Sequence, residues 1–250
     1  MNSKDSKTFP INKIFPIFFL PFVLIVGEIA LDNPGYAASI KGFVKILDRE
    51  GKLKEDHSGV VIFLDEIDSV PDLSIVNRKP ATIRQFKKKF LPEVLPILVG
   101  TVVDFPNEDS IFHNVFSLSK AKPFDLGLYK QGTSQSILFD QTGLVKVYCN
   151  IHPQMIAYVL VLGNSYFTMS DKTGSFVIEN VPLGQGKLRT WYPQTLEHQE
   201  RQIQITNEGV KGTNLSILQN LEFEIQEEVA DITHKNKYGQ NYRPVDYPSR

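Results

Sequence analysis

From residue 41 onward, apolar and polar residues alternate in short runs of the kind that form β-strands. Each run is rich in Val, Ile and Phe and is bounded by Gly, Pro, Asn or Asp. The runs are "GFVKILDR", "GVVIFLDEI", "VLPILVGTVVDF", "FHNVFSL", "SQSILFD", "LVKVYC", "IAYVLVLG", "YFTMS", "GSFVI", "KLRTWYP" and "ERQIQIT". Only "TIRQFKKKF" has a helical pattern, and Pro92 follows it closely. Many short strands at this spacing predict an all-β protein built from sandwiches or barrels.

Polar stretches divide this series of strands. Residues 68–80 ("DSVPDLSIVNRKP") are polar, contain proline and have little periodicity, which predicts a linker. Residues 221–250 become charged and then rich in Tyr, Pro and Asn. This composition predicts a polar C-terminal tail that is extended or partly disordered.

The N-terminus has the pattern of an export signal. Three lysines precede the apolar run at residues 14–27, and the small residues of "NPGYAAS" follow it. The run is short for a bilayer span and contains two prolines, which favours a signal peptide of residues 1–38 over an uncleaved anchor. We therefore expect a periplasmic or secreted protein whose mature chain begins near Ala38 or Ser39, with no membrane span after signal removal.

Cys149 is the only cysteine of the chain, so it has no partner for an internal disulfide. A lone cysteine in an exported protein is expected to be either a small buried apolar residue or a metal ligand. The stretch "YCNIHPQM" places Cys149, His152 and Met155 at three-residue intervals. Two imidazoles and a thiolate with a long axial methionine form the copper site used for electron transfer. The second imidazole must come from another strand, and His113 in "FHNVFSL" is the candidate.

Three other kinds of site use some of these groups. A thiol nucleophile activated by His152 needs an orienting residue and an oxyanion loop, which the sequence does not supply. Zinc takes thiolate and imidazole, but methionine is a poor zinc ligand. A c-type haem requires a second cysteine before the histidine. The remaining histidines, His57, His198 and His234, and the lysines at residues 87–89 are expected to be solvated.

Residues 80–163 resemble the cupredoxins, the blue-copper family that includes plastocyanin and amicyanin. The resemblance lies in "FLPEVLPILVGTVVDF", "VGTVVDFPNEDSIFHNVFS" and "YCNIHPQM", and the short gap between His152 and Met155 is similar to the amicyanin-type loop. It implies a Greek-key β-sandwich holding one type 1 copper. The implied equatorial ligands are His113, Cys149 and His152. Met155 is implied as the axial ligand, and the amide of Asn114 as a link between the two ligand loops.

A second resemblance predicts another domain. "SDKTGSFVIENVPLGQGKLRTWYP" is similar to the carboxypeptidase-regulatory-like, transthyretin-like (Ig-like) β-sandwich, with a hairpin turn at Asp171 and Gly174. Its first strand pair is found far upstream, in "KGFVKILDREGKLKEDHSGVVIFLD". We therefore predict a discontinuous sandwich of residues 41–66 and 164–217, with the copper domain inserted into it. A single elaborated sandwich is the alternative.

These features predict a type 1 copper protein, not an enzyme, that carries single electrons between protein redox partners outside the cytoplasm. The resemblance extends to plastocyanin-like proteins of methylamine utilisation. The alternatives are a copper module for sensing, storage or delivery, and an accessory binding protein of the cell envelope with structural copper. The net charge of −1 gives no reason to expect nucleic acid as a partner. Ile151, Gln154 and Ile156 do not predict an open apolar docking patch, so the partner is not indicated.

Overall fold

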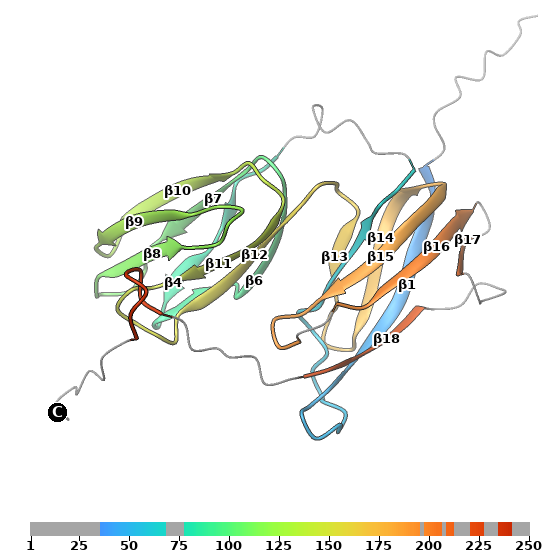
Figure 1. The fold of residues 1–250 in the computed structure, drawn as a ribbon, viewed down its shortest axis with the longest axis horizontal. Helices are drawn as coiled ribbons and strands as arrows, with labels where there is room; N and C mark the ends of the chain where they lie inside the picture. Colours follow the sequence, from blue (N-terminus) through green and yellow to red (C-terminus); the bar gives the residue numbers. More distant parts are fainter. Residues whose placement is uncertain are drawn as a thin grey trace, which may run out of the picture. The chain divides into compact units, whose positions relative to one another are not determined.

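The computed structural model describes residues 36–68, 78–195, 198–206, 209–212, 221–227 and 235–241 (Figure 1). Within these ranges the regular elements are all β-strands, which confirms the predicted all-β fold. Most of the predicted signal peptide and most of the predicted linker fall outside these ranges. The last three residues of the predicted signal peptide, 36–38, are described and form the start of the strand Tyr36–Leu47. In the described part of the chain, no residue belongs to a helix with the length and apolar character needed to span a membrane.

The first sandwich is formed by the strands of residues 81–162. One sheet has the order β6-β12-β11-β8-β9 and the other β10-β7-β3, with a separate β4-β5 hairpin. Apolar residues of both sheets, including Phe105, Val115, Phe139 and Val159, share one buried core. The strands are β3 (Ala81–Thr82), β4 (Arg84–Phe86), β5 (Lys89–Leu91), β6 (Val94–Leu98), β7 (Thr101–Pro106), β8 (His113–Ser117), β9 (Phe124–Tyr129), β10 (Ser134–Phe139), β11 (Gly143–Tyr148) and β12 (Ile156–Leu162).

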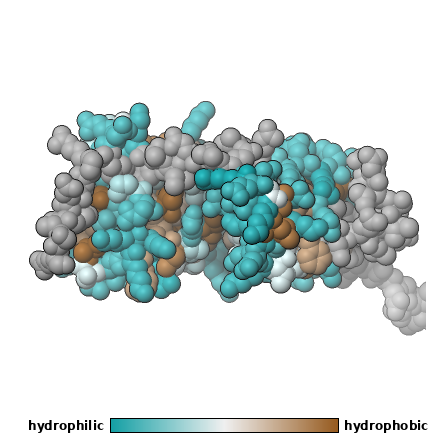
Figure 2. Space-filling model, turned by 90° about the horizontal axis from the view of Figure 1, so that it is seen from below, coloured by the Kyte–Doolittle hydropathy of each residue, from teal (hydrophilic) through white to brown (hydrophobic). Residues whose placement is uncertain are grey.

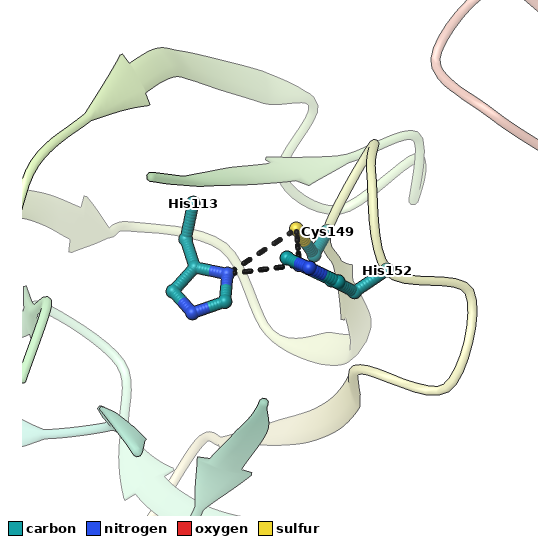
Figure 3. Close-up of side chains that lie close together, drawn as sticks. All are labelled: His113, Cys149 and His152. Atoms are coloured by element: carbon teal, nitrogen blue, oxygen red, sulfur yellow. Dashed lines mark hydrogen bonds between the residues drawn. The ribbon is translucent and has the colours of Figure 1, made fainter. Parts of the chain in front are cut away.

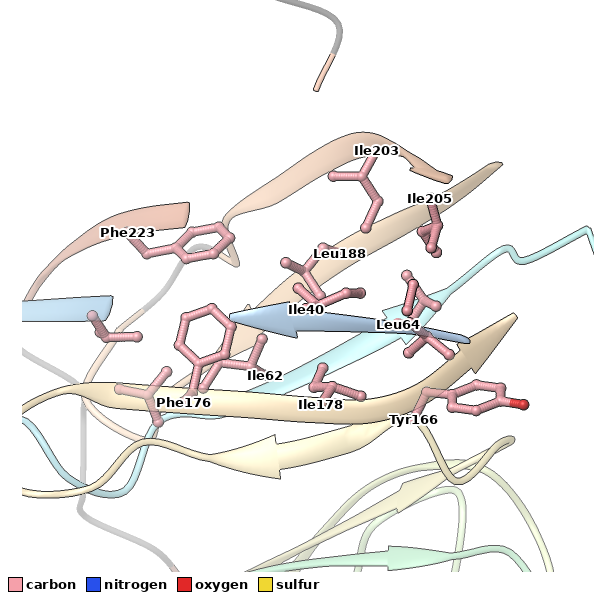
Figure 4. Close-up of a cluster of buried hydrophobic side chains, with 14 of the residues drawn as sticks. Ile40, Ile62, Leu64, Tyr166, Phe176, Ile178, Leu188, Ile203, Ile205 and Phe223 are labelled. Carbon is pink, nitrogen blue, oxygen red and sulfur yellow. The ribbon is translucent and has the colours of Figure 1, made fainter. Parts of the chain in front are cut away.

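The second sandwich contains a sheet of order β14-β1-β18 and a sheet of order β13-β2-β15-β16-β17. Its core is a separate cluster of aliphatic and aromatic side chains that includes Ile40, Leu64, Phe176 and Leu188 (Figure 4). The strands are β1 (Tyr36–Leu47), β2 (Val61–Asp65), β13 (Phe167–Met169), β14 (Ser175–Pro182), β15 (Gly184–Trp191), β16 (Glu200–Thr206), β17 (Gly209–Gly212) and β18 (Leu221–Gln226).

The chain leaves the second sandwich after β2 and returns to it at β13. β1 pairs antiparallel with β14, and β2 pairs antiparallel with both β13 and β15. The strands of the first sandwich, β3 to β12, therefore lie in sequence between β2 and β13, two strands of the second sandwich that pair with each other. The hairpin turn at Asp171 is present, and its carboxylate accepts the backbone N–H groups of Thr173 and Ser175. Gly174 in this turn has φ +85°, and a Cβ there would meet the carbonyl oxygen of Val44 at 2.0 Å, so glycine is required.

The first six residues of the predicted polar tail (221–250) form the strand β18 (Leu221–Gln226). Residues 221–226 ("LEFEIQ") pair in parallel with residues 42–47 of β1. Phe223 and Ile225 are buried in the core, while Glu222 and Glu224 are exposed. Apolar and polar residues alternate strictly in this segment, which is the pattern of a half-buried strand. The sequence analysis overlooked this alternation because the segment carries two glutamates.

The segment "TIRQFKKKF" forms the β4-β5 hairpin, and not a helix. It turns at Lys87 and Lys88, whose φ angles are +52° and +55°. All three lysines at residues 87–89 are exposed, as expected. On the face drawn in Figure 2, the coloured surface is mostly hydrophilic with hydrophobic residues interspersed. The hairpin turn matters because its backbone contacts the candidate site.

Candidate metal centre

Three neighbouring strands bring the predicted ligands together. His113 is the first residue of β8, and Cys149 follows the last residue of β11. β8 and β11 are paired through Phe116 and Tyr148, and β11 pairs with β12, which begins directly after Met155. The loop of residues 149–155 therefore lies beside the start of β8.

Backbone hydrogen bonds close this loop. The N–H of Cys149 donates to the carbonyl of Met155 at 3.3 Å, and the N–H of Met155 donates to the carbonyl of His152 at 2.9 Å. Pro153 stands within the turn and restricts its backbone. The turn directs His152 back toward Cys149.

The side chains of His113, Cys149 and His152 converge on one point (Figure 3). The two Nδ1 atoms are 3.0 Å apart, and the Cys149 Sγ is 3.9 Å from His113 Nδ1 and 3.7 Å from His152 Nδ1. Metal–imidazole and metal–thiolate bonds are about 2.0–2.3 Å long, which separates donors around one ion by about 3–4 Å. The triangle therefore fits a single metal ion. Among the described residues, this is the one group of at least three His, Cys, Asp or Glu side chains arranged to hold a metal.

Burial sets the protonation of the site. His113 and Cys149 are fully buried and His152 is 6% exposed. Burial lowers the pKa of His152, and the neighbouring His113 and Lys88 lower it further, so its ring is neutral and able to bind a metal. Burial raises the pKa of the Cys149 thiol, although backbone hydrogen bonds at Asn114, Ile151 and His152 act in the opposite direction. Metal binding is therefore expected to release the thiol proton.

Asp109 fixes the orientation of His113. Its Oδ2 lies 2.8 Å from His113 Nε2, and its carboxylate also accepts the backbone N–H groups of Lys87 at 2.6 Å and Lys88 at 2.8 Å. Burial raises the pKa of Asp109, but the hydrogen bonds from Lys88, His113 and Lys87 outweigh it, so the pKa lies below its usual value. We assign the proton of His113 to Nε2, which leaves the Nδ1 lone pair facing Cys149.

The sequence analysis missed Asp109, although its position four residues before His113 was visible in "DSIFH". We expect Asp109→Asn to weaken copper affinity by roughly 10-fold, because ligand-orienting partners typically contribute 10–100-fold and asparagine can still accept one hydrogen bond. Competition with a chelator of known affinity measures this change. Asp140→Asn is the matched control, since that carboxylate pairs with Lys122 at 2.8 Å on the surface. Equal affinities for the two variants would contradict the role given to Asp109.

The side-chain amide of Asn114 does not make the direct link between ligand loops that the resemblance implied, although the backbone of Asn114 hydrogen-bonds the Cys149 thiol. Its Nδ2 donates to Asp125 Oδ1 at 2.7 Å and to the carbonyl of Gly127 at 3.0 Å, both in β9. Its Oδ1 is buried and has no hydrogen-bond partner.

The remaining predicted residues fall into two groups. Met155 is fully buried in the same core cluster as Cys149, and its axial role stays a prediction. The other histidines are not part of the metal triangle: His57 accepts the backbone N–H of Ile46 at 3.0 Å, and His198 is exposed. His234 lies outside the described residues.

Sequence comparisons give no family assignment: neither the models of protein families nor the curated proteins contain a match to the chain. Similar solved structures include the copper-containing nitrite reductase NirK from Thermus scotoductus SA-01 (28% identity, TM-score 0.34), covering 36% of this chain but only 24% of the reductase. A purple cupredoxin from Nitrosopumilus maritimus aligns at 29% identity and TM-score 0.30, over 33% of this chain and 99% of that protein. A Cu(I) form of an amicyanin mutant aligns at 20% identity and TM-score 0.32, over 43% of this chain and 100% of amicyanin.

Proposed function

We propose that the chain is an extracytoplasmic type 1 copper protein that carries single electrons between protein partners. The observation that carries this proposal is the buried triangle of one sulfur and two imidazole nitrogens, with separations of 3.0–3.9 Å. Soft thiolate with two imidazoles suits copper, and a weak axial thioether completes the set used for electron transfer. His113, Cys149 and His152 would hold the metal, and Met155 would be the axial ligand.

The burial of Cys149 argues against a catalytic thiol. A nucleophilic cysteine is partly exposed and has a depressed pKa. Cys149 is fully buried, and burial raises the pKa of its thiol. The site is therefore suited to holding a metal and not to nucleophilic attack by Cys149 on a substrate.

The rigidity of the ligand positions supports electron transfer over metal delivery. Copper would supply the one-electron chemistry, and the residues of the chain would hold it in positions fixed by hydrogen bonds. His113 is held by Asp109, and Cys149 and Met155 are held by the backbone bonds of their loop. These fixed positions keep the reorganisation that accompanies electron transfer small.

Electrons would enter and leave through the least buried ligand, His152. Exposed apolar residues adjoin the ligands in sequence: Ile111 and Phe112 precede His113, and Ile151 precedes His152. Phe112 is 56% exposed, and the sequence analysis did not select it. These side chains are the proposed contacts for a protein partner.

The test is to add Cu(II) to the purified protein and then reduce and reoxidise it repeatedly in the presence of a copper chelator. An electron carrier shows an intense visible absorption that disappears on reduction and returns fully on oxidation. Loss of copper to the chelator after reduction would instead indicate a protein for storage or delivery. A colourless protein containing stoichiometric Cu(II) would exclude a type 1 site.

A further inference from the structure

A short C-terminal segment, residues 235–241, contacts the part of the first sandwich that carries the ligands (red in Figure 1). The backbone N–H of Lys237 donates to Asn150 Oδ1 at 3.0 Å. The Nζ of the same lysine donates to Asp125 Oδ2 at 2.7 Å. One residue of this segment thus holds two separate parts of the sandwich.

The segment has its own local structure, which fixes the position of Lys237. Asn236 Oδ1 accepts the backbone N–H groups of Tyr238 and Gln240, both at 3.0 Å. The backbone N–H of Asn236 donates to the carbonyl of Gln240 at 2.8 Å. The backbone N–H of Gly239 donates to the carbonyl of Asn236 at 2.9 Å. This asparagine-centred turn orders the residues on both sides of Lys237.

Of the two parts held by Lys237, one is the ligand loop itself and the other is β9, which is bonded to the segment of His113. Asn150 directly follows Cys149, and Asp125 accepts the side-chain amide of Asn114, which directly follows His113. The hydrogen bonds therefore run from Asn114 through Asp125 and Lys237 to Asn150. They add a connection through a third segment to the direct backbone hydrogen bond between Asn114 and Cys149.

We infer that Lys237 is a positioning residue for the metal centre and joins the segment of His113, through Asp125 and Asn114, to the loop of Cys149. The expected effect on the metal rests on the proposed copper site. The hydrogen bonds of Lys237 to Asn150 and Asp125 involve protein atoms alone and do not depend on that proposal. Lys237 also places a positive charge beside the ligand segments. A nearby cation disfavours Cu(II) relative to Cu(I), so removing it is expected to lower the reduction potential.

The decisive variant is Lys237→Met, which removes the charge and the bond to Asp125 but keeps the backbone bond to Asn150. The matched control is Lys122→Met: the Lys122–Asp140 pair has an Nζ–Oδ1 distance of 2.8 Å, and the lysine side chain is 24% exposed compared with 25% for Lys237. We expect Lys237→Met to release copper several-fold faster, below the roughly 10–100-fold effect of direct ligand partners. Its reduction potential should fall, and Lys237→Arg should restore both values.

A measurement on the metal-free protein separates this inference from the copper assignment. Amide hydrogen exchange at Cys149 and Met155 reports the closing bonds of the ligand loop, and Lys237→Met should accelerate it while Lys122→Met should not. If the wild-type protein fails to form a coloured copper site but this acceleration is seen, the proposed function is wrong and the inference stands. If exchange, copper release and potential are the same in both variants, Lys237 does not position the site.

Discussion

Cys149→Ser is expected to abolish the visible colour of the Cu(II)-loaded protein completely. The intense absorption of a type 1 site comes from charge transfer between the cysteine sulfur and Cu(II), and a serine oxygen does not provide it. Sγ of Cys149 is within 3.9 Å of both histidine Nδ1 atoms, so it is placed to form this bond. Absorption spectra recorded at equal copper content measure the loss.

The other ligand variants are controls that must behave differently. Met155→Leu should keep the colour and mainly raise the reduction potential, because the axial thioether is a long and weak contact. His113→Ala and His152→Ala should open an equatorial position to water and weaken copper retention. Equal loss of colour in Met155→Leu and Cys149→Ser would overturn the roles assigned to the two sulfur atoms.

The three residues of the candidate metal triangle and most strands were predictable because their signals are local. Cys149 and His152 lie on one loop, and His113 opens a strand that follows a polar turn, so a short motif specifies each. The alternation of apolar and polar residues likewise predicts most strands of both sandwiches. β18 was missed because Glu222 and Glu224 made an alternating strand appear to be a charged tail.

The partners of the ligands were not predictable, because they depend on contacts between distant segments. Asp109 is close to His113 in sequence, but its role depends on the hairpin turn at Lys87 and Lys88, more than twenty positions upstream. Lys237 is 112 residues from Asp125 and 87 from Asn150. Neither hydrogen-bonding pattern has a periodicity in the sequence, and only the position of Asp109 four residues before His113 could have suggested its role.

Phe223→Ala is expected to lower the free energy of unfolding of the metal-free protein by about 3–5 kcal/mol, the usual cost of removing a buried phenylalanine ring. Phe223 is fully buried in β18, and its ring centroid lies 6.2 Å from that of Phe176 in β14. The guanidinium of Arg201 lies over the same ring, 4.5 Å from its centroid, so the substitution also removes a cation–π contact. Urea titration followed by circular dichroism measures the change.

The control for this variant is Leu118→Ala, because Leu118 is 59% exposed and its removal should change stability by no more than about 0.5 kcal/mol. A loss of less than about 1 kcal/mol in Phe223→Ala would contradict the assignment of β18 to the core, since a fully buried ring cannot be removed at so small a cost. The larger loss would show that the second sandwich is completed only when the chain returns at Leu221–Gln226 to pair with β1. The C-terminal region would then stabilise the second sandwich through Phe223, and Lys237 further along it would position the metal ligands of the first.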